Sequence, residues 1–542
     1  MYILGINGNL GRESHDPAAV LVKNGEVLFA IEEERINRIK HSPGKLPINA
    51  IKRVLELSSI EMTDVSYIAF PQNSWGQLFK DRLISTINHW FGCCPEIRFY
   101  NHHLCHGASA YYASGIEKEC LALNIDGSGD GISISSYVFN REKYKVISET
   151  KFPNSLGLLY SIITQYLGFE KNNEEYKVMS LAALGSDNNI LNNFIKKNDF
   201  EKIEVKSEIQ TDLLEKMTFP FYLTKQEPFY NEETLKLYCH RRIPGSDIKK
   251  EHMDLAADLQ RNFENLVIEI IENLKKETKL DCLVLSGGSM LNCKFVGELL
   301  KKVKFDKFYL PPFPDDSGNA FGAAYLCSIE NGFYPQKLLT PFLGDYYSDE
   351  SIKCILETCK INYIYVEDKA KDILNQLVND KIIANFSGGM EFGPRALGNR
   401  SILANVHTND ITHRLNSIKK RYSFQPFAIA VLDEDAKEYL KIQKFKSPYM
   451  NIIFDVKEEK YKNLKNVVHA DGTIRVQTIT EEHSSLFPIL SMMKKEELDP
   501  IIINTSFNRK GEPIVRTPED AIATFFSTGI DVLYLNNYKI IK

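Results

Sequence analysis

The stretch YNHHLCHGASAYY (100–112), followed by LALNIDGSGDG (121–131), carries the strongest structural signal in the chain. His102 and His106 are four residues apart, a spacing that places both imidazoles on one face of a helix. The apolar run after them predicts a buried strand that ends at Asp126 in a glycine-rich turn. Imidazoles and a carboxylate can hold a divalent metal, and neighbouring glycines let backbone N–H groups approach a phosphate. The pattern indicates a metal beside a phosphate cradle, although the His pair alone also fits a helix with packed or solvated histidines.

Composition narrows the class of protein. A chain of 542 residues with 43% hydrophobic and 25% charged residues predicts a soluble globular protein of two or more domains. The net charge of −5 gives no basic surface for a nucleic acid, and no apolar run approaches a membrane span. The start MYILGINGNL lacks the features of a signal peptide, and the ten cysteines are scattered. We expect a cytoplasmic protein without nucleic-acid or membrane partners, and we leave oligomerisation open.

The N-terminal part has the pattern of a duplicated fold. Its strand–turn–strand meander recurs near 121–138, which predicts an α/β architecture of the actin/hexokinase type. The phosphate loops would be GINGN (5–9) and DGSGDG (126–131), and the adenosine loop would be SGGSMLN (286–292). The alternative is that these are ordinary glycine turns of an α/β protein.

A second domain follows a Pro-, Gly- and aromatic-rich linker at 331–349. Strands such as FAIAVL (427–432) and PIIINTSF (500–507) alternate with helices and predict an α+β domain. We therefore divide the chain into residues 1–340 and residues 350–542.

Two further positions in the N-terminal part have side chains suited to chemistry. His15 and Asp16 follow a glycine-rich turn, where a histidine is either a general base for a hydroxyl or a solvated surface residue. Asp315 and Asp316 precede a helix of small residues, where a carboxylate either completes the metal site or caps the helix.

The second domain holds cations and polar donors among apolar strands. Arginine forks with amide and hydroxyl donors suit a phosphate-bearing anion, and the alternative is solvated loop residues. No P-loop, G-x-S-x-G elbow or H-E-x-x-H motif supports the common kinase, esterase or protease mechanisms. The candidates are Arg395, Arg400, Lys419, Arg421, Arg475, Asn504, Ser506, Asn508 and Arg516.

Taken in order, the motifs resemble those of the carbamoyltransferases of antibiotic and nodulation-factor biosynthesis, over essentially the whole chain. The matching segments are SHDPAAVLVKNGEVLFAIEEERINRIKH (14–41), NHHLCHGASAYY (101–112), EEYKVMSLAALG (174–185), SGGSMLN (286–292), FGPRALGNRSILA (392–404), HADGTIRVQ (469–477) and NTSFNRKGEPIV (504–515).

The resemblance implies that the smaller C-terminal domain is similar to the YrdC-like synthases of carbamoyl- or threonylcarbamoyl-adenylate. Their Lys-x-Arg and Ser-x-Asn signature matches Lys419 and Arg421, as catalytic residues, and Ser506 with Asn508. This domain would convert carbamoyl phosphate and ATP to carbamoyl-adenylate. The substrate-binding residues would be Arg395, Lys419, Arg475, Asn504, Ser506 and Asn508.

The resemblance also implies that the N-terminal domain is similar to the actin-like enzymes that transfer threonylcarbamoyl groups to tRNA. His102, His106, Asp126 and Asp316 would hold a divalent metal, with Fe²⁺ favoured by the resemblance, and His15 with Asp16 would take the proton of a small-molecule hydroxyl acceptor. We expect the acceptor pocket, for a natural product or sugar, near 186–250. The nucleotide contacts would be Lys40, Asp126, Gly127, Gly129, Gly287, Gly288 and Asn292.

The chain departs from the family pattern near the expected anion site. Tyr422, Gln425 and Ile429 stand where the family often has Glu, Arg and Pro, and Gly389 replaces a usual Arg. Because two arginines of the family pattern are absent, we expect the residues that contact carbamoyl phosphate to differ from those of the family. Two alternatives stay open: a tRNA threonylcarbamoyl-type transferase, and a nucleotide- and metal-binding regulator without activity.

Overall fold

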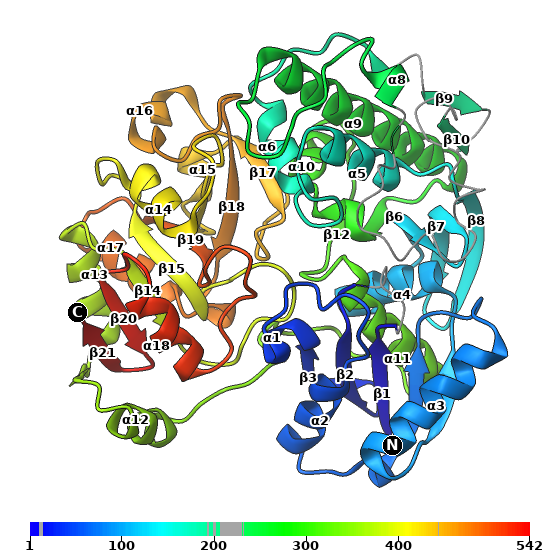
Figure 1. Ribbon diagram of the computed structural model, residues 1–542, viewed down its shortest axis with the longest axis horizontal. Coiled ribbons are helices and arrows are strands. Elements are labelled where there is room, and N and C mark those ends of the chain that lie inside the picture. The colour runs from blue at the N-terminus through cyan, green and yellow to red at the C-terminus, as the bar shows by residue number, and fades with distance from the viewer. Residues whose placement is uncertain (10–14, 192–194, 199–201, 206–229, 231, 443) are drawn as a thin grey trace. The chain divides into compact units, whose positions relative to one another are not determined.

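The computed structural model describes residues 1–9, 15–191, 195–198, 202–205, 230, 232–442 and 444–542. The chain is an α/β protein, as predicted, and it forms two compact units (Figure 1). The first unit comprises Met1–Leu28 and Pro43–Leu338, and the second comprises Phe29–Ser42 and Leu339–Lys542.

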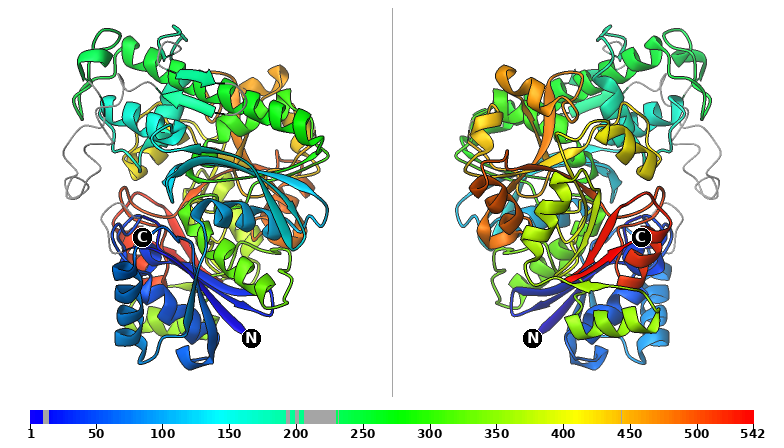
Figure 2. Two further views of the ribbon diagram at one scale, coloured as in Figure 1. Left: turned by 90° about the vertical axis from the view of Figure 1, so that its right-hand side faces the viewer. Right: turned by 90° about the vertical axis from the view of Figure 1, so that its left-hand side faces the viewer.

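The first unit contains two five-stranded sheets with the same order. The first sheet runs β3 (Glu26–Glu32), β2 (Ala18–Lys23), β1 (Tyr2–Asn7), β4 (Val65–Phe70), β5 (Glu96–Phe99), and from Phe29 onward the residues of β3 belong to the second unit. The second runs β8 (Lys143–Lys151), β7 (Ile132–Asn140), β6 (Cys120–Gly129), β11 (Cys282–Ser286), β12 (Lys307–Tyr309). In each sheet the central strand is antiparallel to one neighbour and parallel to the other (β1 with β2 and β4, β6 with β7 and β11). Figure 2 shows the first sheet in dark blue and the long strands of the second in blue to cyan. This repetition confirms the predicted internal duplication.

Two buried helices of the first unit, α4 (His102–Ser114) and α11 (Asn319–Glu330), pack closely together. A Cβ on Gly322 would lie 1.9 Å from the carbonyl oxygen of Cys105, so glycine is needed for this approach. Asn101 starts α4 by accepting a hydrogen bond from the N–H of Leu104. The other elements of the unit are α2 (Ile48–Leu57), α3 (Gln77–Phe91), α5 (Leu156–Tyr166), α6 (Glu175–Ala182), β9 (Ile195–Asn198), β10 (Lys202–Val205), α8 (Glu232–Leu235), α9 (Lys250–Thr278) and α10 (Cys293–Lys302).

The second unit is built on a mixed nine-stranded sheet. Its order is β13 (Ile364–Tyr365), β21 (Tyr538–Ile541), β20 (Val532–Leu535), β14 (Ile383–Phe386), β15 (Arg400–Asn405), β19 (Ile501–Ser506), β16 (Ala428–Leu432), β18 (Thr473–Ile479), β17 (Ile452–Asp455). Within this sheet β14 pairs with β20 and β16 pairs with β18 in parallel, and the other neighbouring strands pair antiparallel. Its helices are α1 (Glu33–Asn37), α12 (Asp349–Thr358), α13 (Lys369–Val378), α14 (Ile411–Lys419), α15 (Ala436–Tyr439), α16 (Tyr461–Leu464), α17 (Phe487–Lys495) and α18 (Pro518–Phe526).

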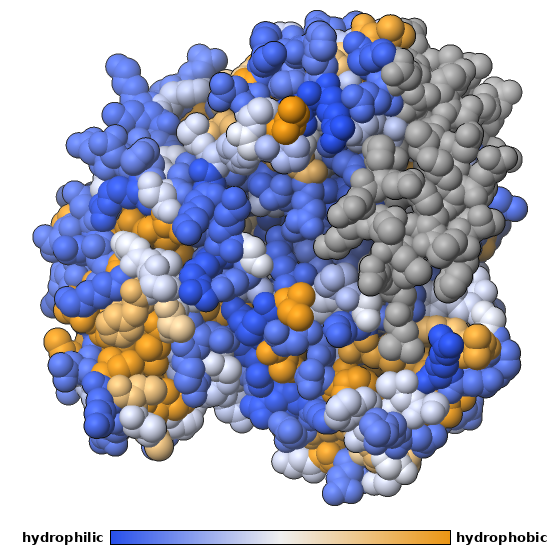
Figure 3. Space-filling model, viewed as in Figure 1, coloured by the Kyte–Doolittle hydropathy of each residue, from blue (hydrophilic) through white to orange (hydrophobic). Residues whose placement is uncertain are grey.

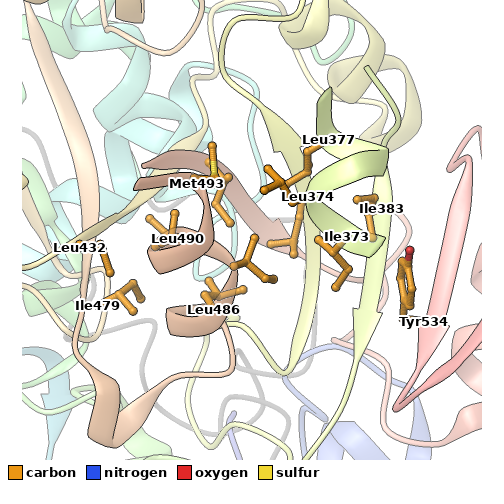
Figure 4. Close-up of a cluster of buried hydrophobic side chains, with 14 of the residues drawn as sticks. Ile373, Leu374, Leu377, Ile383, Leu432, Ile479, Leu486, Leu490, Met493 and Tyr534 are labelled. Atoms are coloured by element: carbon orange, nitrogen blue, oxygen red, sulfur yellow. The ribbon is translucent and has the colours of Figure 1, made fainter. Parts of the chain in front are cut away.

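A buried apolar cluster joins α13 and α17 of the second unit to the sheet. Figure 4 shows Leu374 and Leu377 of α13 near Leu490 and Met493 of α17. These side chains are at most 5% exposed, and burying a Leu or Met stabilises the fold by roughly 1.5–3 kcal/mol.

Residues 29–42 belong to the second unit, although the division predicted at 340–350 leaves them in the first. Glu32 accepts a hydrogen bond from the N–H of Gly393 (2.7 Å), and Arg35 donates to the Gly393 carbonyl (2.7 Å). Arg38 donates to the carbonyls of Pro513 and Ile514. The partners are more than 350 residues away along the chain, so no local pattern could reveal these contacts.

The face drawn in Figure 3 is mainly hydrophilic, with hydrophobic residues in separate patches. Among the described residues, no helix is both long enough and apolar enough to span a bilayer.

Candidate functional site

The first unit brings together the four residues predicted to hold a metal. His102 Nε2 lies 3.3 Å from Asp126 Oδ2 and 3.4 Å from Asp316 Oδ1. His106 Nε2 lies 3.8 Å and 3.4 Å from the same two oxygens. One ligand atom from each residue falls within 4.8 Å of every other, so a single ion can be reached by all four.

Each ligand comes from an element whose placement the sequence explains. Both histidines lie on α4, one turn apart, while Asp126 lies in β6 and Asp316 begins a short 3-10 turn before α11. Gly129 leaves room for the ring of His102, because a Cβ there would lie 2.1 Å from the ring. The glycine-rich turn therefore packs directly against the imidazole of His102.

The electrostatics of the cluster favour opposite charges. Burial opposes a charge on His102, but Asp316 and Asp126 outweigh it and raise the pKa to about 10. The same opposing effects raise the pKa of His106. Burial would raise the pKa of Asp126, but His102 and His106 lower it well below its usual value, and that of Asp316 falls to about 2. Protons on the imidazoles thus balance the carboxylates, and a bound metal would displace them.

The donor set fits a divalent metal. Asp316 Oδ1 is buried without a hydrogen-bond partner, which leaves it available for a cation. His106 Nδ1 lies 3.3 Å from Ser286 Oγ, the kind of second contact that orients a metal-binding imidazole.

Neighbouring polar residues of the same motifs have structural contacts instead. Asp130 accepts a hydrogen bond from the N–H of His102 (2.8 Å), at the start of α4. Asp315 caps the 3-10 turn through the N–H of Ser317. Cys105 is buried, which raises its thiol pKa well above the usual value. The sequence leaves open whether a carboxylate here completes the metal site or caps the helix, and Asp315 makes the capping contact.

His15 is paired with Asp16. His15 Nδ1 lies 2.8 Å from Asp16 Oδ2, and the Asp16 carbonyl accepts a hydrogen bond from Asn7. Burial opposes protonation of His15, but Asp16 and the charges of Asp316 and Asp126 raise its pKa to about 10. The pKa shift shows that the field of the metal-site carboxylates reaches His15.

The predicted nucleotide loops differ in how much room they offer. A Cβ on Gly127 would meet nothing within 4 Å, so space lies open beside this turn. Gly287 has φ +96° and packs on the Ile125 carbonyl, and the Gly288 N–H donates to Asp126 (3.3 Å). Asn292 caps α10 and exchanges two hydrogen bonds with Gln260, so its side chain already has protein partners.

The second unit brings Lys419 together with Ser506 and Asn508. Lys419 Nζ donates to the carbonyls of Ser506 (2.7 Å) and Asn508 (2.9 Å) and to the side-chain oxygen of Asn508. Burial, with the positive charges of Arg421 and Lys40, lowers the lysine pKa well below its usual value. Lys40 belongs to the second unit, whereas the sequence predicts it as a nucleotide contact of the first unit. Crowded cations of this kind are stabilised by an anionic ligand.

The remaining predicted cations and amides occupy varied positions. The guanidinium of Arg421 lies 5.3 Å from the centre of the Phe427 ring, and Arg395 is partly buried. Arg475 Nε and Asn504 Oδ1 are buried without hydrogen-bond partners. Asn504 also donates to Gln477 (2.7 Å).

Comparison with known proteins identifies the family. The carbamoyltransferase N-terminus model matches residues 3–85 and 77–325, and the carbamoyltransferase C-terminus model matches residues 374–542. The chain belongs to the carbamoyltransferase family. It is therefore a transferase, and both the resemblance and the enzyme class predicted from the sequence are confirmed.

Relatives within the family cover nearly the whole chain. Nodulation protein NolNO of Sinorhizobium fredii (strain NBRC 101917 / NGR234) is 34% identical, over 100% of this chain and 83% of its own length. The 3'-hydroxymethylcephem-O-carbamoyltransferase of Streptomyces clavuligerus is 23% identical over 94% of each chain. A solved structure of full-length HypF in the phosphate- and nucleotide-bound form has a TM-score of 0.36 and 14% identity, over 60% of this chain and 55% of that one.

The positions that depart from the family pattern have structural contacts in this carbamoyltransferase. Gln425 is buried and accepts a hydrogen bond from the N–H of Tyr422 (3.0 Å), while Tyr422 stacks on Phe424. Ile429 is buried in β16, and Gly389 packs against the Phe342 carbonyl. These residues stabilise the loop before β16 and the loop after β14.

Other polar residues of these motifs have protein partners, and one of them was not singled out in the sequence. Arg400 donates to carbonyls of its own loop, including Ser387 (2.7 Å), and Arg516 pairs with Asp345 (2.6 Å). Glu391 accepts three backbone hydrogen bonds from residues 397–400 and was not singled out. In the sequence, its position directly before the polar FGPRALGNRS motif could have indicated this role.

Of the residues expected to form the acceptor pocket, 186–250, those at 192–194, 199–201, 206–229 and 231 lie outside the described part of the chain.

Proposed function

We propose that this protein is an ATP-dependent O-carbamoyltransferase whose two units catalyse different steps of the reaction. The second unit makes carbamoyl-adenylate from carbamoyl phosphate and ATP, and the first transfers the carbamoyl group to a hydroxyl of a small molecule. The observation that carries the proposal is the convergence of His102, His106, Asp126 and Asp316 on one point. Family membership and the O-carbamoyltransferase relative support the type of transfer.

The first half-reaction would use the Lys419 cluster, in a YrdC-like role for the second unit. Carbamoyl phosphate gives carbamate when water takes its phosphoryl group. A carbamate oxygen then attacks the α-phosphorus of ATP, the new O–P bond forms, and pyrophosphate leaves. Lys419, Arg421 and Lys40 would balance the phosphate charges, and anion binding would restore the proton that burial disfavours on Lys419.

The second half-reaction would take place at the metal cluster. A metal held by His102, His106, Asp126 and Asp316 would act as a Lewis acid toward the carbamoyl carbonyl. Two imidazoles and two carboxylates suit Fe²⁺, and they also suit Mn²⁺, Co²⁺, Ni²⁺ or Zn²⁺.

His15 would accept the proton of the acceptor hydroxyl as its oxygen attacks the carbamoyl carbon. The C–O bond to AMP then breaks, and AMP leaves with the O-carbamoylated product. Asp16 holds His15 Nδ1 and leaves Nε2 to act as the base. A cation held by Asp126 and Asp316 would offset the smaller part of the rise in the His15 pKa, which comes from those two carboxylates, while the larger part, from Asp16, would remain.

The test is incubation of the full chain with ATP, carbamoyl phosphate and each divalent metal, followed by assay of AMP, pyrophosphate and carbamoyl-adenylate. Lys419→Ala should abolish adenylate formation while the bound metal is retained. Lys437→Ala, which removes an exposed lysine of the same unit, serves as the control. If Lys419→Ala leaves adenylate formation intact, the assignment of the second unit is wrong. If the wild-type protein forms no adenylate with any metal or acceptor, the proposal of an enzyme is wrong and the alternative, an inactive regulator, is favoured.

A further inference from the structure

Asn319 shares the metal cluster although it is neither a histidine nor a carboxylate. It is the first residue of α11 and is fully buried. Its Nδ2 lies 3.2 Å from His102 Nε2 and 3.1 Å from His106 Nε2. These are the two nitrogens that also lie 3.3–3.8 Å from the Asp126 and Asp316 oxygens. The same Nδ2 also lies 3.5 Å from His102 Nδ1, so the amide end lies over the face of the His102 ring and beside His106 Nε2, at the edge of the cluster.

The spacing of these atoms is that of ligands around one ion. With metal–ligand bonds of about 2.1 Å, neighbouring ligands are separated by about 3.0 Å in an octahedron and by about 3.4 Å in a tetrahedron. The distance from Asn319 Nδ2 to His106 Nε2 matches the shorter of these separations. The amide is thus within reach of an ion held by His106, and rotation about its side-chain bonds would move it off the face of the His102 ring.

The orientation of the amide is the second observation. Asn319 Oδ1 is buried and has no hydrogen-bond partner, while the NH₂ group faces the two imidazole nitrogens. Imidazoles that bind a metal use these nitrogen lone pairs for the ion, so they can no longer accept an N–H. A half-turn about the Cβ–Cγ bond exchanges Nδ2 and Oδ1 within the same volume. It points the oxygen that lacks a partner at the cation.

We infer that Asn319 is a fifth protein ligand, through Oδ1, of the metal proposed for this site. The inference rests on the proposed function, because it needs His102, His106, Asp126 and Asp316 to bind a metal. Five nitrogen and oxygen ligands suit an ion of high coordination number, such as Mn²⁺, Fe²⁺ or Co²⁺. They disfavour the four-coordinate tetrahedral geometry of most zinc sites. Asn319 thereby narrows the choice of metal that the other four residues leave open.

The experiment loads the metal-free full chain with Co²⁺ and records the visible absorption spectrum and the affinity against a competing chelator. Wild type should give the weak bands of five- or six-coordinate Co²⁺. Asn319→Ala should give stronger bands, as coordination number falls, and about 10- to 100-fold weaker binding. Asn319→Asp, which keeps an oxygen ligand and adds a charge, should bind Co²⁺ more tightly than wild type.

Asn331→Ala is the matched control, because Asn331 lies at the other end of α11 and donates to the Cys327 carbonyl (2.7 Å). An Asn319→Ala protein with the wild-type spectrum and affinity would overturn the inference and leave the four-residue site standing. Wild type without Co²⁺ binding would instead contradict the metal site of the proposed function. Thermal unfolding of each metal-free variant shows whether it folds. If Asn319→Ala does not fold, the decision passes to Asn319→Asp, for which an unchanged spectrum and affinity would overturn the inference.

Discussion

At the scale of single residues, three histidines of one short motif have different chemical environments. His102 and His106 face carboxylates, but His103 lies between Ser135 Oγ (3.0 Å) and the Ile132 carbonyl (2.9 Å). Burial and the neighbouring imidazoles lower the His103 pKa to about 3, so this ring stays neutral. Helical spacing alone separates the pair from the third histidine, because residues four apart share a face and adjacent residues do not.

The first prediction concerns metal content. His102→Ala and Asp316→Ala should each remove most of the metal that the wild-type chain retains after dialysis, because each deletes a ligand from a buried set. Elemental analysis of the purified variants measures this. His89→Ala, on α3, is the control. Full metal content in both ligand variants would show that the cluster does not bind the ion.

Sequence reasoning pointed to the four residues of the candidate metal site, because helix spacing, a strand end and a resemblance indicate them. It did not reach Asn319 or Glu391. An asparagine at a helix start is usually read as a cap, and only the folded chain shows that Asn319 is directed at two imidazoles 213 and 217 residues away. The cations of the second unit were predicted as one class, yet Arg400 binds backbone carbonyls while Lys419 lies among polar groups.

At the scale of elements, the contact between α4 and α11 holds the histidines against Asp316. Gly322→Ala should destabilise the chain by about 3 kcal/mol, because its Cβ would fall 1.9 Å from a backbone oxygen that has no room to move. Urea unfolding measures the free energy. Gly76→Ala, where a Cβ meets nothing within 4 Å, should change it little. Equal stabilities for the two variants would contradict the close packing of these helices.

The carboxyl group of Asp258, on α9, lies beside that of Asp187 and predicts a pH dependence. Asp258 is fully buried and accepts from the Leu191 N–H (2.7 Å). Burial and the adjoining Asp187 raise its pKa to about 6. A carboxyl with a raised pKa binds its proton more tightly in the folded chain than in the unfolded chain. Its contribution to stability is therefore full below about pH 4 and lost as the pH rises toward 6.

The variant Asp258→Asn keeps a neutral group of the same shape, so it should be more stable than wild type by about 1 kcal/mol at pH 7. Near pH 4 the two proteins should unfold alike in a thermal melt. The neighbouring change Asn262→Ala removes a hydrogen bond to Asp258 without removing the carboxyl, so it should keep the pH dependence. A constant difference between Asp258→Asn and wild type at all pH values would contradict the assignment.

The elements also differ in how far sequence could predict them. The duplicated sheets follow from local strand and turn patterns that recur, and these patterns read well from sequence. The order of the nine-stranded sheet does not, because pairs such as β14 with β20 join strands about 150 residues apart. Such pairings depend on the burial of whole faces, which no local window contains.

At the scale of the whole molecule, an N-terminal stretch is incorporated into the C-terminal unit. Glu32, Arg35 and Arg38 bind backbone groups of the 393 and 513–514 loops, and Lys40 adds its charge to the field at Lys419. The second unit therefore includes residues that a division by sequence assigns to the first. A fragment that starts after the linker would lack these contacts.

Lys40 tests this organisation. Lys40→Ala should raise the KM for ATP or carbamoyl phosphate in adenylate formation by about tenfold, the effect of losing one hydrogen bond to a charged group. Metal content should be unchanged, because Lys40 belongs to the second unit and the metal cluster to the first. Lys45→Ala removes an exposed lysine five residues away and should behave as wild type. If Lys40→Ala lowers metal content or slows only the transfer step, Lys40 acts at the first unit, as a nucleotide contact there would.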